Sequence, residues 1–306
     1  MKKYILSLAF GIVAHAGIYA QATFQGQAVY ESKRSVDKML GNVSQMRIGG
    51  NNVTPEMQER MKERMRKAFE KTYILNFDRT ASTYKEEEKL EANGNQAGMR
   101  MMMASMSGGG GTYYKDVKDK TFTVDKEFMG KEFLVKDSLI VYKWQMSGET
   151  KKIGDYTVYK ATAVIPVDGS DLTNFRPRAN PNNPSSDKKE DDKTKSEEAQ
   201  KTSFFSQMEL PKEKTVTAWY TPEIPVNQGP EGYWGLPGLI LEVNDGTTTI
   251  VCSKVVINPK EKLDIKAPKK GKAVSQKEFT ETSMKKMEEM REQFQRGGGG
   301  AINIGR

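Results

Sequence analysis

The segment GYWGLPGLILEV, residues 232–243, restricts the fold more than any other part of this 306-residue chain. Proline holds its own φ at about −65°, and glycine tolerates the positive φ that the third position of a type II turn requires. The neighbours Pro237 and Gly238 therefore predict a type II turn. An aromatic pair, Tyr233 and Trp234, stands just before this turn.

A hairpin is expected directly after the turn. Residues 239–243 have the composition of a strand, Asn244-Asp245-Gly246 is a typical turn sequence, and residues 247–256 supply the partner strand. Many other short segments alternate in polarity and are joined by brief polar turns, which is typical of an antiparallel meander. These further strands are predicted at residues 23–33, 72–77, 81–90, 112–117, 121–128, 132–135, 142–146, 156–165 and 215–220.

The first helix is predicted over residues 54–71. Thr54 is a favoured N-cap residue, and Pro55 suits the first helical position. Methionines and an aromatic residue recur at helical spacing on one face, while arginine and glutamate occupy the others. This apolar face consists of Met57, Met61, Met65 and Phe69.

A second helix is predicted over residues 275–295, where Ser275 and Glu278 have the spacing of a capping box. The chain order is thus one strand, one helix, many strands and a final helix. This order predicts a mainly antiparallel β protein with two flanking helices. We expect a curved sheet or half-barrel around the first helix, with the methionine face toward the concave side of the sheet.

The domain organisation follows from composition. Residues 1–20 have the charged start, apolar run and small residues of an export signal that is cleaved near Ala20. Residues 21–165 and 203–274 are predicted to form a single β-rich domain. The polar residues 166–202 between them are predicted to be a disordered insertion, and residues 275–306 a C-terminal helix with a glycine-rich tail.

Residue usage excludes several kinds of function. His15 is the only histidine, so the chain without its signal has none, which excludes Ser-His-Asp and Cys-His catalysis and histidine-bound zinc. We therefore predict that the protein is not an enzyme and needs no cofactor. Cys252 is the only cysteine, which allows no internal disulfide; within a strand it is expected to be a small buried apolar residue.

Charge and hydropathy further restrict the kinds of partner and the cellular location that we expect. The net charge is +8, but basic and acidic residues are interspersed, without a basic stripe that would indicate a nucleic-acid partner. After the signal, no segment reaches the roughly 18 apolar residues that a membrane-spanning helix needs. The sequence thus predicts an exported protein, either periplasmic or secreted, with no transmembrane segment.

Several motifs resemble those of the GLPGLI family of exported proteins from Gram-negative bacteria. The name-giving motif stands at residues 235–240, and AWYTPEIP at 218–225 precedes it. Further specific matches are FMGKEF at 128–133 and KAT at 160–162, and the match at the first strand is weaker. The resemblance implies an exported protein but no biochemical activity. The cysteine found before the Lys-Ala pair in many members is replaced here by Thr157-Val158-Tyr159.

The leading hypothesis is an envelope protein that binds a lipid-like ligand or a partner protein. The methionine face of the first helix would cover an apolar concave sheet, and the aromatic residues near the GLPGLI turn would form its rim. A structural alternative is that these aromatic and apolar residues only close one end of the sheet. The predicted binding residues are Met57, Met61, Met65, Phe69, Trp219, Tyr233, Trp234 and Leu236.

Two other functions remain open. Thioether sulfur is a soft ligand that suits Cu(I), so clustered methionines could bind copper, although packing is the commoner use of such stripes. The candidate ligands are Met99, Met101, Met103 and Met106, with Met284, Met287 and Met290 as a second group. The other alternative is an accessory or structural protein of an outer-membrane complex that has no small ligand.

Overall fold

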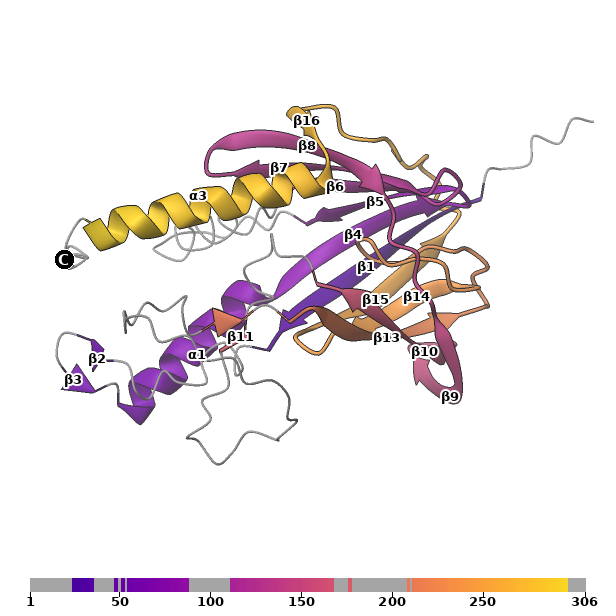
Figure 1. Ribbon diagram of the computed structural model, residues 1–306. Coiled ribbons are helices and arrows are strands. Elements are labelled where there is room, and N and C mark those ends of the chain that lie inside the picture. Colours follow the sequence, from indigo (N-terminus) through magenta and orange to yellow (C-terminus); the bar gives the residue numbers. More distant parts are fainter. Residues whose placement is uncertain are drawn as a thin grey trace, which may run out of the picture.

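The structure is a computed structural model that describes residues 24–35, 47–48, 51–52, 54–87, 111–167, 176–177, 208–209 and 211–296 (Figure 1). Several predicted features lie outside these residues. They are the export signal at 1–20, most of the polar insertion at 166–202, the glycine-rich tail and the methionine group at 99–106.

One open, curled sheet of twelve strands makes up most of the described chain. The strands, in the order in which they pair, are β16 (Lys272–Val274), β8 (Lys131–Ser138), β7 (Thr121–Phe128), β6 (Thr112–Asp116), β5 (Ala81–Glu86), β4 (Lys71–Asp78), β1 (Gln25–Arg34), β15 (Thr248–Ile257), β14 (Leu239–Asn244), β13 (Glu213–Thr221), β10 (Tyr156–Pro166) and β9 (Gln145–Ile153). Two separate pairs of short strands are β2 (Arg47–Ile48) with β3 (Asn51–Asn52), and β11 (Arg176–Pro177) with β12 (Met208–Glu209). The prediction of a mainly antiparallel curved sheet is confirmed.

Strand β1 joins two antiparallel runs of strands. On one side β4 to β8 follow in chain order, and on the other side β15 leads back through β14, β13 and β10 to β9. At the centre, Tyr30 of β1 pairs with Tyr73 of β4 and with Cys252 of β15. Only β16 runs parallel to its neighbour, β8. Because β10 pairs with β13, strands from both sides of the predicted insertion lie in the same sheet.

Helices α1 (Pro55–Phe69) and α3 (Gln276–Arg296) begin at the predicted caps. The Met57 amide donates to Thr54 Oγ1 at 3.2 Å. At the start of α3, the Ser275 amide donates to Glu278 Oε2 at 2.7 Å, and the Glu278 amide donates back to Ser275 Oγ at 3.2 Å. Both helices therefore start where short-range hydrogen bonding satisfies their first amides.

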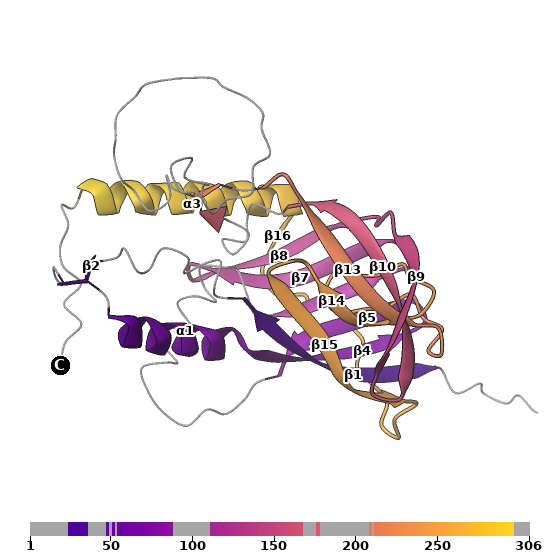
Figure 2. The same cartoon turned by 90° about the horizontal axis from the view of Figure 1, so that it is seen from below.

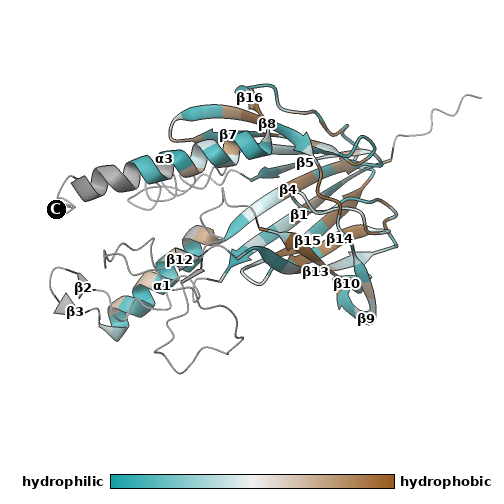
Figure 3. Ribbon diagram, in the orientation of Figure 1, coloured by the Kyte–Doolittle hydropathy of each residue, from teal (hydrophilic) through white to brown (hydrophobic). Residues whose placement is uncertain are grey.

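The position of α1 differs from our prediction. Both helices project from the same end of the sheet, and α1 contacts β1 near its C-terminal end instead of lying on the concave face (Figures 1 and 2). Both helices are also mostly hydrophilic, whereas apolar residues gather in the sheet (Figure 3). The physical reason is that the loop 222–238, between β13 and β14, already occupies the interior.

The core consists of three clusters of buried side chains that follow the sheet around its curl. The first lies over β1, β4 and β15, the second over β10, β13 and β14, and the third over β7 and β8. Phe279 of α3 belongs to the third cluster and attaches the start of that helix to the sheet. Residues of the loop 222–238 contribute to all three clusters.

The predicted strand positions agree well, with one informative exception. We expected a strand at 142–146, but β9 begins only at Gln145. Residues 139–144 instead form a linker that leads from β8 at one side of the sheet to β9 at the other. Tyr142 and Trp144 in this linker hydrogen-bond to the loop 222–238, so they are held by contacts distant in sequence.

Candidate functional site

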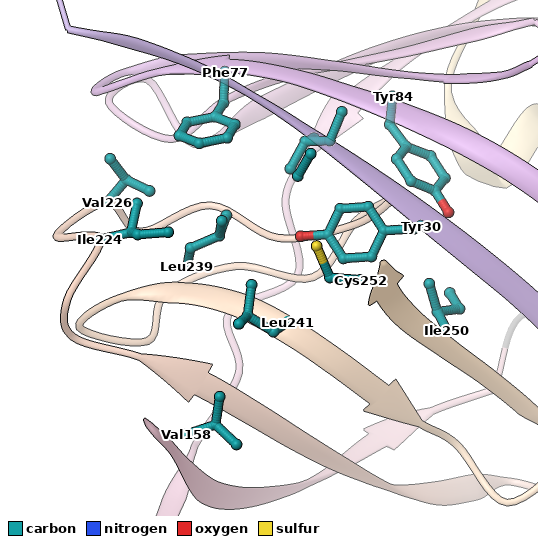
Figure 4. Close-up of a cluster of buried hydrophobic side chains, with 12 residues drawn as sticks. Tyr30, Phe77, Tyr84, Val158, Ile224, Val226, Leu239, Leu241, Ile250 and Cys252 are labelled. Carbon is teal, nitrogen blue, oxygen red and sulfur yellow. The ribbon is translucent and has the colours of Figure 1, made fainter. Parts of the chain in front are cut away.

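The loop 222–238, which carries most of the GLPGLI motif, folds into the interior of the sheet. Ile224 and Val226 are buried in the first core cluster, where they lie with Leu239, Phe77 and Tyr30 (Figure 4). Backbone bonds hold the loop to the strand that follows it: Leu239 donates to the Ile224 carbonyl, and the next amide to the Gln228 carbonyl, both at 3.0 Å. The loop is therefore a packed part of the core.

A fully buried lysine holds this loop from β6. The Lys115 ammonium donates to the carbonyl oxygens of Gly229, Glu231 and Tyr233 at 2.9, 3.0 and 2.8 Å. An ammonium has three N–H donors, and here each finds an acceptor. Burial lowers the pKa of Lys115 to about 7, although the nearby charge of Glu231 acts in the opposite direction. The Lys115 side chain thus fixes three carbonyls of the loop, at alternate residues, to one strand.

The aromatic residues just before the GLPGLI motif connect the two sides of the sheet. Trp144 Nε1 donates to the Trp234 carbonyl at 2.9 Å, and Trp234 Nε1 donates to the Ile140 carbonyl at 2.8 Å. Tyr233 belongs to the second core cluster, whereas Trp234 packs against the third. These two hydrogen bonds therefore hold the loop 222–238 and the linker 139–144 together.

The turn at Pro237 is not the predicted type II turn. The positive φ, 93°, belongs to Gly235, and Gly238 does not adopt one. Instead, the Gly238 amide donates to the Leu236 carbonyl at 2.8 Å, which is the hydrogen bond of a three-residue γ-turn. Gly238 is required for another reason, because a Cβ atom there would lie 2.1 Å from the Thr221 carbonyl oxygen.

The predicted binding residues are not brought together in one place. Leu236 and Tyr233 are buried, and Trp234 is half-buried in the loop. Trp219, on β13, is half-buried beneath the Lys151 ammonium, which lies 4.3 Å from its ring centroid. The helix residues Met61, Met65 and Phe69 form a separate, partly buried group, and Met57 is exposed. Their roles in binding stay predictions.

The sulfur-containing side chains of the described chain lie in different surroundings, and copper binding through methionine stays a prediction. Cys252 is buried as predicted, and burial raises the pKa of its thiol to about 12, which keeps it protonated at neutral pH. Met284 is exposed on α3, while the side chains of Met287 and Met290 lie outside what the structure describes. Within the described residues, no three His, Cys, Asp or Glu side chains are placed to share one metal ion.

The strand β9 has a surface that sequence reasoning did not single out. It is the last strand of the sheet, and no other described strand pairs with its outer side. Seven large apolar side chains are exposed among those described, and five of them lie on β9, on its neighbour β10 or on the linker 139–144. These five, which we call the β9 patch, are Ile140, Val141, Met146, Tyr159 and Val164.

A comparison with known protein families matches part of the chain. Residues 144–242 match a family described as "Protein of unknown function (Porph_ging)". The matched region covers all of β9, β10 and β13, the loop 222–238 and the start of the hairpin that follows. No curated protein matches the sequence.

Two solved structures are similar to this one at a low level. They are structures of PNGF-II in space groups C2 and P21, with TM-scores of 0.40 and 0.41 and 12% sequence identity in each case. The similarity covers 85% of this chain but 33% of each of theirs, so the chain spans about a third of the length of the proteins it matches.

Proposed function

We propose that this protein is a non-enzymatic, exported envelope protein that binds an extended segment of a partner protein along β9. The observation that carries the proposal is the coincidence of an unpaired edge strand with the β9 patch. An edge strand presents free backbone N–H and C=O groups, and adding a strand from another chain satisfies them. Apolar side chains beside the edge supply the contacts that select a sequence.

The two halves of β9 differ in a way that supports this mode of binding. Around its start, Val141 and Met146 are 69% and 60% exposed, so apolar surface gathers at this end of the edge. The second half carries Glu149, Lys151 and Lys152, and charges on an edge oppose indiscriminate pairing. A partner strand is therefore expected to dock at the apolar start and to end before the charges.

The loop 222–238 supports the patch from behind. The linker that carries Ile140 and Val141 is bonded to this loop through Trp234 and Trp144, and the loop is anchored by Lys115. A surface held in this way loses little conformational entropy on binding, which favours affinity. The same loop fills the concave interior with its own side chains, so we prefer a protein partner to a lipid inside the sheet.

Two sequence features support the rest of the proposal. The predicted export signal at residues 1–20 supports a location in the envelope or outside the cell. A chain that loses His15 with this signal has few ways to perform acid–base catalysis. Within the described residues, no helix combines the length and apolar character needed to cross a bilayer.

The test is site-specific photo-crosslinking in the envelope of the protein's own host. Gln145, exposed at the start of β9, is replaced by p-benzoylphenylalanine, and mass spectrometry identifies the crosslinked peptide. We expect one defined segment of one partner protein. Met146→Glu, which adds a charge at the exposed edge, should abolish the crosslink.

The matched control is Met284→Glu, which makes the same change at an exposed methionine on α3. It should leave the crosslink intact, and both variants should unfold at the temperature of the parent. A crosslink that survives Met146→Glu, or that both variants weaken equally, contradicts binding along β9. A crosslink to a lipid alone contradicts the choice of a protein partner.

A further inference from the structure

A basic hollow lies at the end of the sheet from which α1 projects. Its volume is about 270 Å³, and it is formed by the end of β1, the last turn of α1 and the hairpin between β14 and β15. Three cationic side chains line it, Lys33, Arg34 and Arg66, together with one acid, Glu70. The hydroxyl-bearing residues Thr247 and Thr249 line it from the hairpin. The lining therefore combines an excess of positive charge with hydrogen-bond donors.

The position of Arg34 is fixed by its neighbours. Its Nε donates to Thr248 Oγ1 at 3.1 Å, and its guanidinium carbon lies 5.8 Å from the centroid of the Phe69 ring. Phe69 is the last residue of α1, so the contact also brings Arg66, one turn earlier, to the same hollow. A guanidinium held by packing is well suited to bind an oxyanion, because less entropy is lost when it does.

The hairpin side of the hollow is also well ordered. The Asp245 carboxylate accepts hydrogen bonds from the amides of Thr247 and Thr248 at 3.0 and 2.8 Å and pairs with Lys214 at 2.6 Å. The Ser35 amide donates to the Thr247 carbonyl at 2.8 Å, which ties the end of β1 to the hairpin. The Thr247 hydroxyl donates to Asp245 Oδ1 at 2.8 Å, and the Thr249 hydroxyl accepts from Asn244 Nδ2 at 2.7 Å, so the lining residues of the hairpin are held in place.

We propose that this hollow binds a phosphate monoester as a dianion. Three cations and one carboxylate give the lining an excess of two positive charges, which a dianion neutralises, and Lys33 also lies 3.8 Å from Glu31 beside the hollow. Guanidinium groups match phosphate oxygens in geometry, and the Thr249 hydroxyl, which accepts from Asn244, retains a proton that it can donate. A hollow of 270 Å³ holds about nine waters' worth of volume, enough for a phosphate with a small attached group. The monoester is either a soluble metabolite or the headgroup of a lipid.

Calorimetry with inorganic phosphate tests the site at constant ionic strength, with chloride as the reference anion. Arg66→Gln should weaken binding about tenfold, since it removes one charge-assisted contact. Lys67→Gln, one position along the same helix, removes the same charge outside the hollow and should change the affinity less than about twofold. Glu70→Gln should tighten binding, because it removes the only acid in the lining.

Two further arms separate the sources of the phosphate. One titrates glucose 6-phosphate, and the other measures co-sedimentation with phosphatidylcholine vesicles with and without phosphatidic acid. Binding of glucose 6-phosphate that depends on Arg66 but not on Lys67 assigns a soluble monoester. The same dependence for vesicles that contain phosphatidic acid assigns a lipid headgroup. Equal effects of Arg66→Gln and Lys67→Gln, or binding in none of the three experiments, overturn the proposal.

Discussion

The loop 222–238 and the helix α1 carry similar apolar side chains, yet they have opposite places in the molecule. Leu236, in the loop, has no exposed surface, and backbone and side-chain hydrogen bonds fasten the loop on several sides. Met57, in the helix, is 50% exposed, and the helix touches the sheet mainly through β1. A segment can be buried here when its backbone polar groups find hydrogen-bond partners. The loop meets this condition without forming a helix.

The same comparison explains why the loop can be buried at all. Its backbone lacks regular secondary structure, so each buried carbonyl needs its own donor. Lys115 supplies three such donors, while Trp144 and Trp234 supply others for the loop and linker. A helix satisfies its backbone internally and can remain at the surface without loss.

Removing the buried lysine should have the largest effect. Lys115→Met keeps much of the side-chain volume but leaves three buried carbonyls without donors, so we expect a loss of about 4 kcal/mol in the free energy of unfolding. Urea titration measures it. Lys118→Met, at an exposed turn residue, should change stability by less than about 0.5 kcal/mol. A small loss for Lys115→Met would show that the loop does not depend on this residue.

Truncation of apolar side chains in the two regions compares them directly. Leu236→Ala creates a cavity among buried neighbours and should cost about 3 kcal/mol. Met61→Ala, in the partly buried group on α1, should cost less than about 1 kcal/mol, because solvent fills the space. Both are measured by urea unfolding, and equal losses would mean that α1 is packed as tightly as the loop.

Asp245, in the turn between β14 and β15, should make a smaller and pH-dependent contribution to the free energy of unfolding. Burial alone would raise the pKa of this carboxyl, but Lys214 and the hydrogen bonds from Thr247 and Thr248 lower it to about 2 from an ordinary 3.8. Because the folded-state pKa is lowered, the stabilisation is present above about pH 4 and is lost as the pH falls toward 2. It should amount to about 2 kcal/mol at neutral pH.

Asp245→Asn tests this effect with little change in shape, since the amide oxygen can still accept from the turn amides. The free energy of unfolding is measured against pH for both proteins. The difference between the profiles should be largest at neutral pH and shrink between about pH 4 and 2. Parallel profiles would contradict the role of the Lys214–Asp245 pair.

The sequence predicts those parts of the fold that depend on near neighbours. The caps at Thr54 and Ser275 act within three residues, and strand β7 occupies the predicted residues 121–128, because a local pattern encodes each. Lys115 could not be identified in this way. It stands in the charged segment KDVKDK, as a surface lysine would, and its acceptors lie more than 110 residues further along the chain.

The candidate site shows the same limit. Pro237 and Gly238 indicated a turn, but the approach of the Thr221 carbonyl, which decides its form, comes from another strand. The β9 patch could not be predicted because a strand is an edge strand only when no other strand pairs with one of its sides. The local sequence does not show which strands pair. The placement of α1 was wrong because its methionine spacing shows an apolar face but does not say what that face contacts.

The pairing of β1 with β15 also sets the order of events when the chain folds. The hydrogen bond between Gln25 and Asn258 joins residues 233 positions apart. The strands on each side of β1 can pair with their neighbours along the chain. The pairing of β1 with β15, however, forms only after the chain has been synthesised as far as β15. Such non-local closure slows folding. Until β15 has been made, the side of β1 that pairs with it therefore remains without its partner strand.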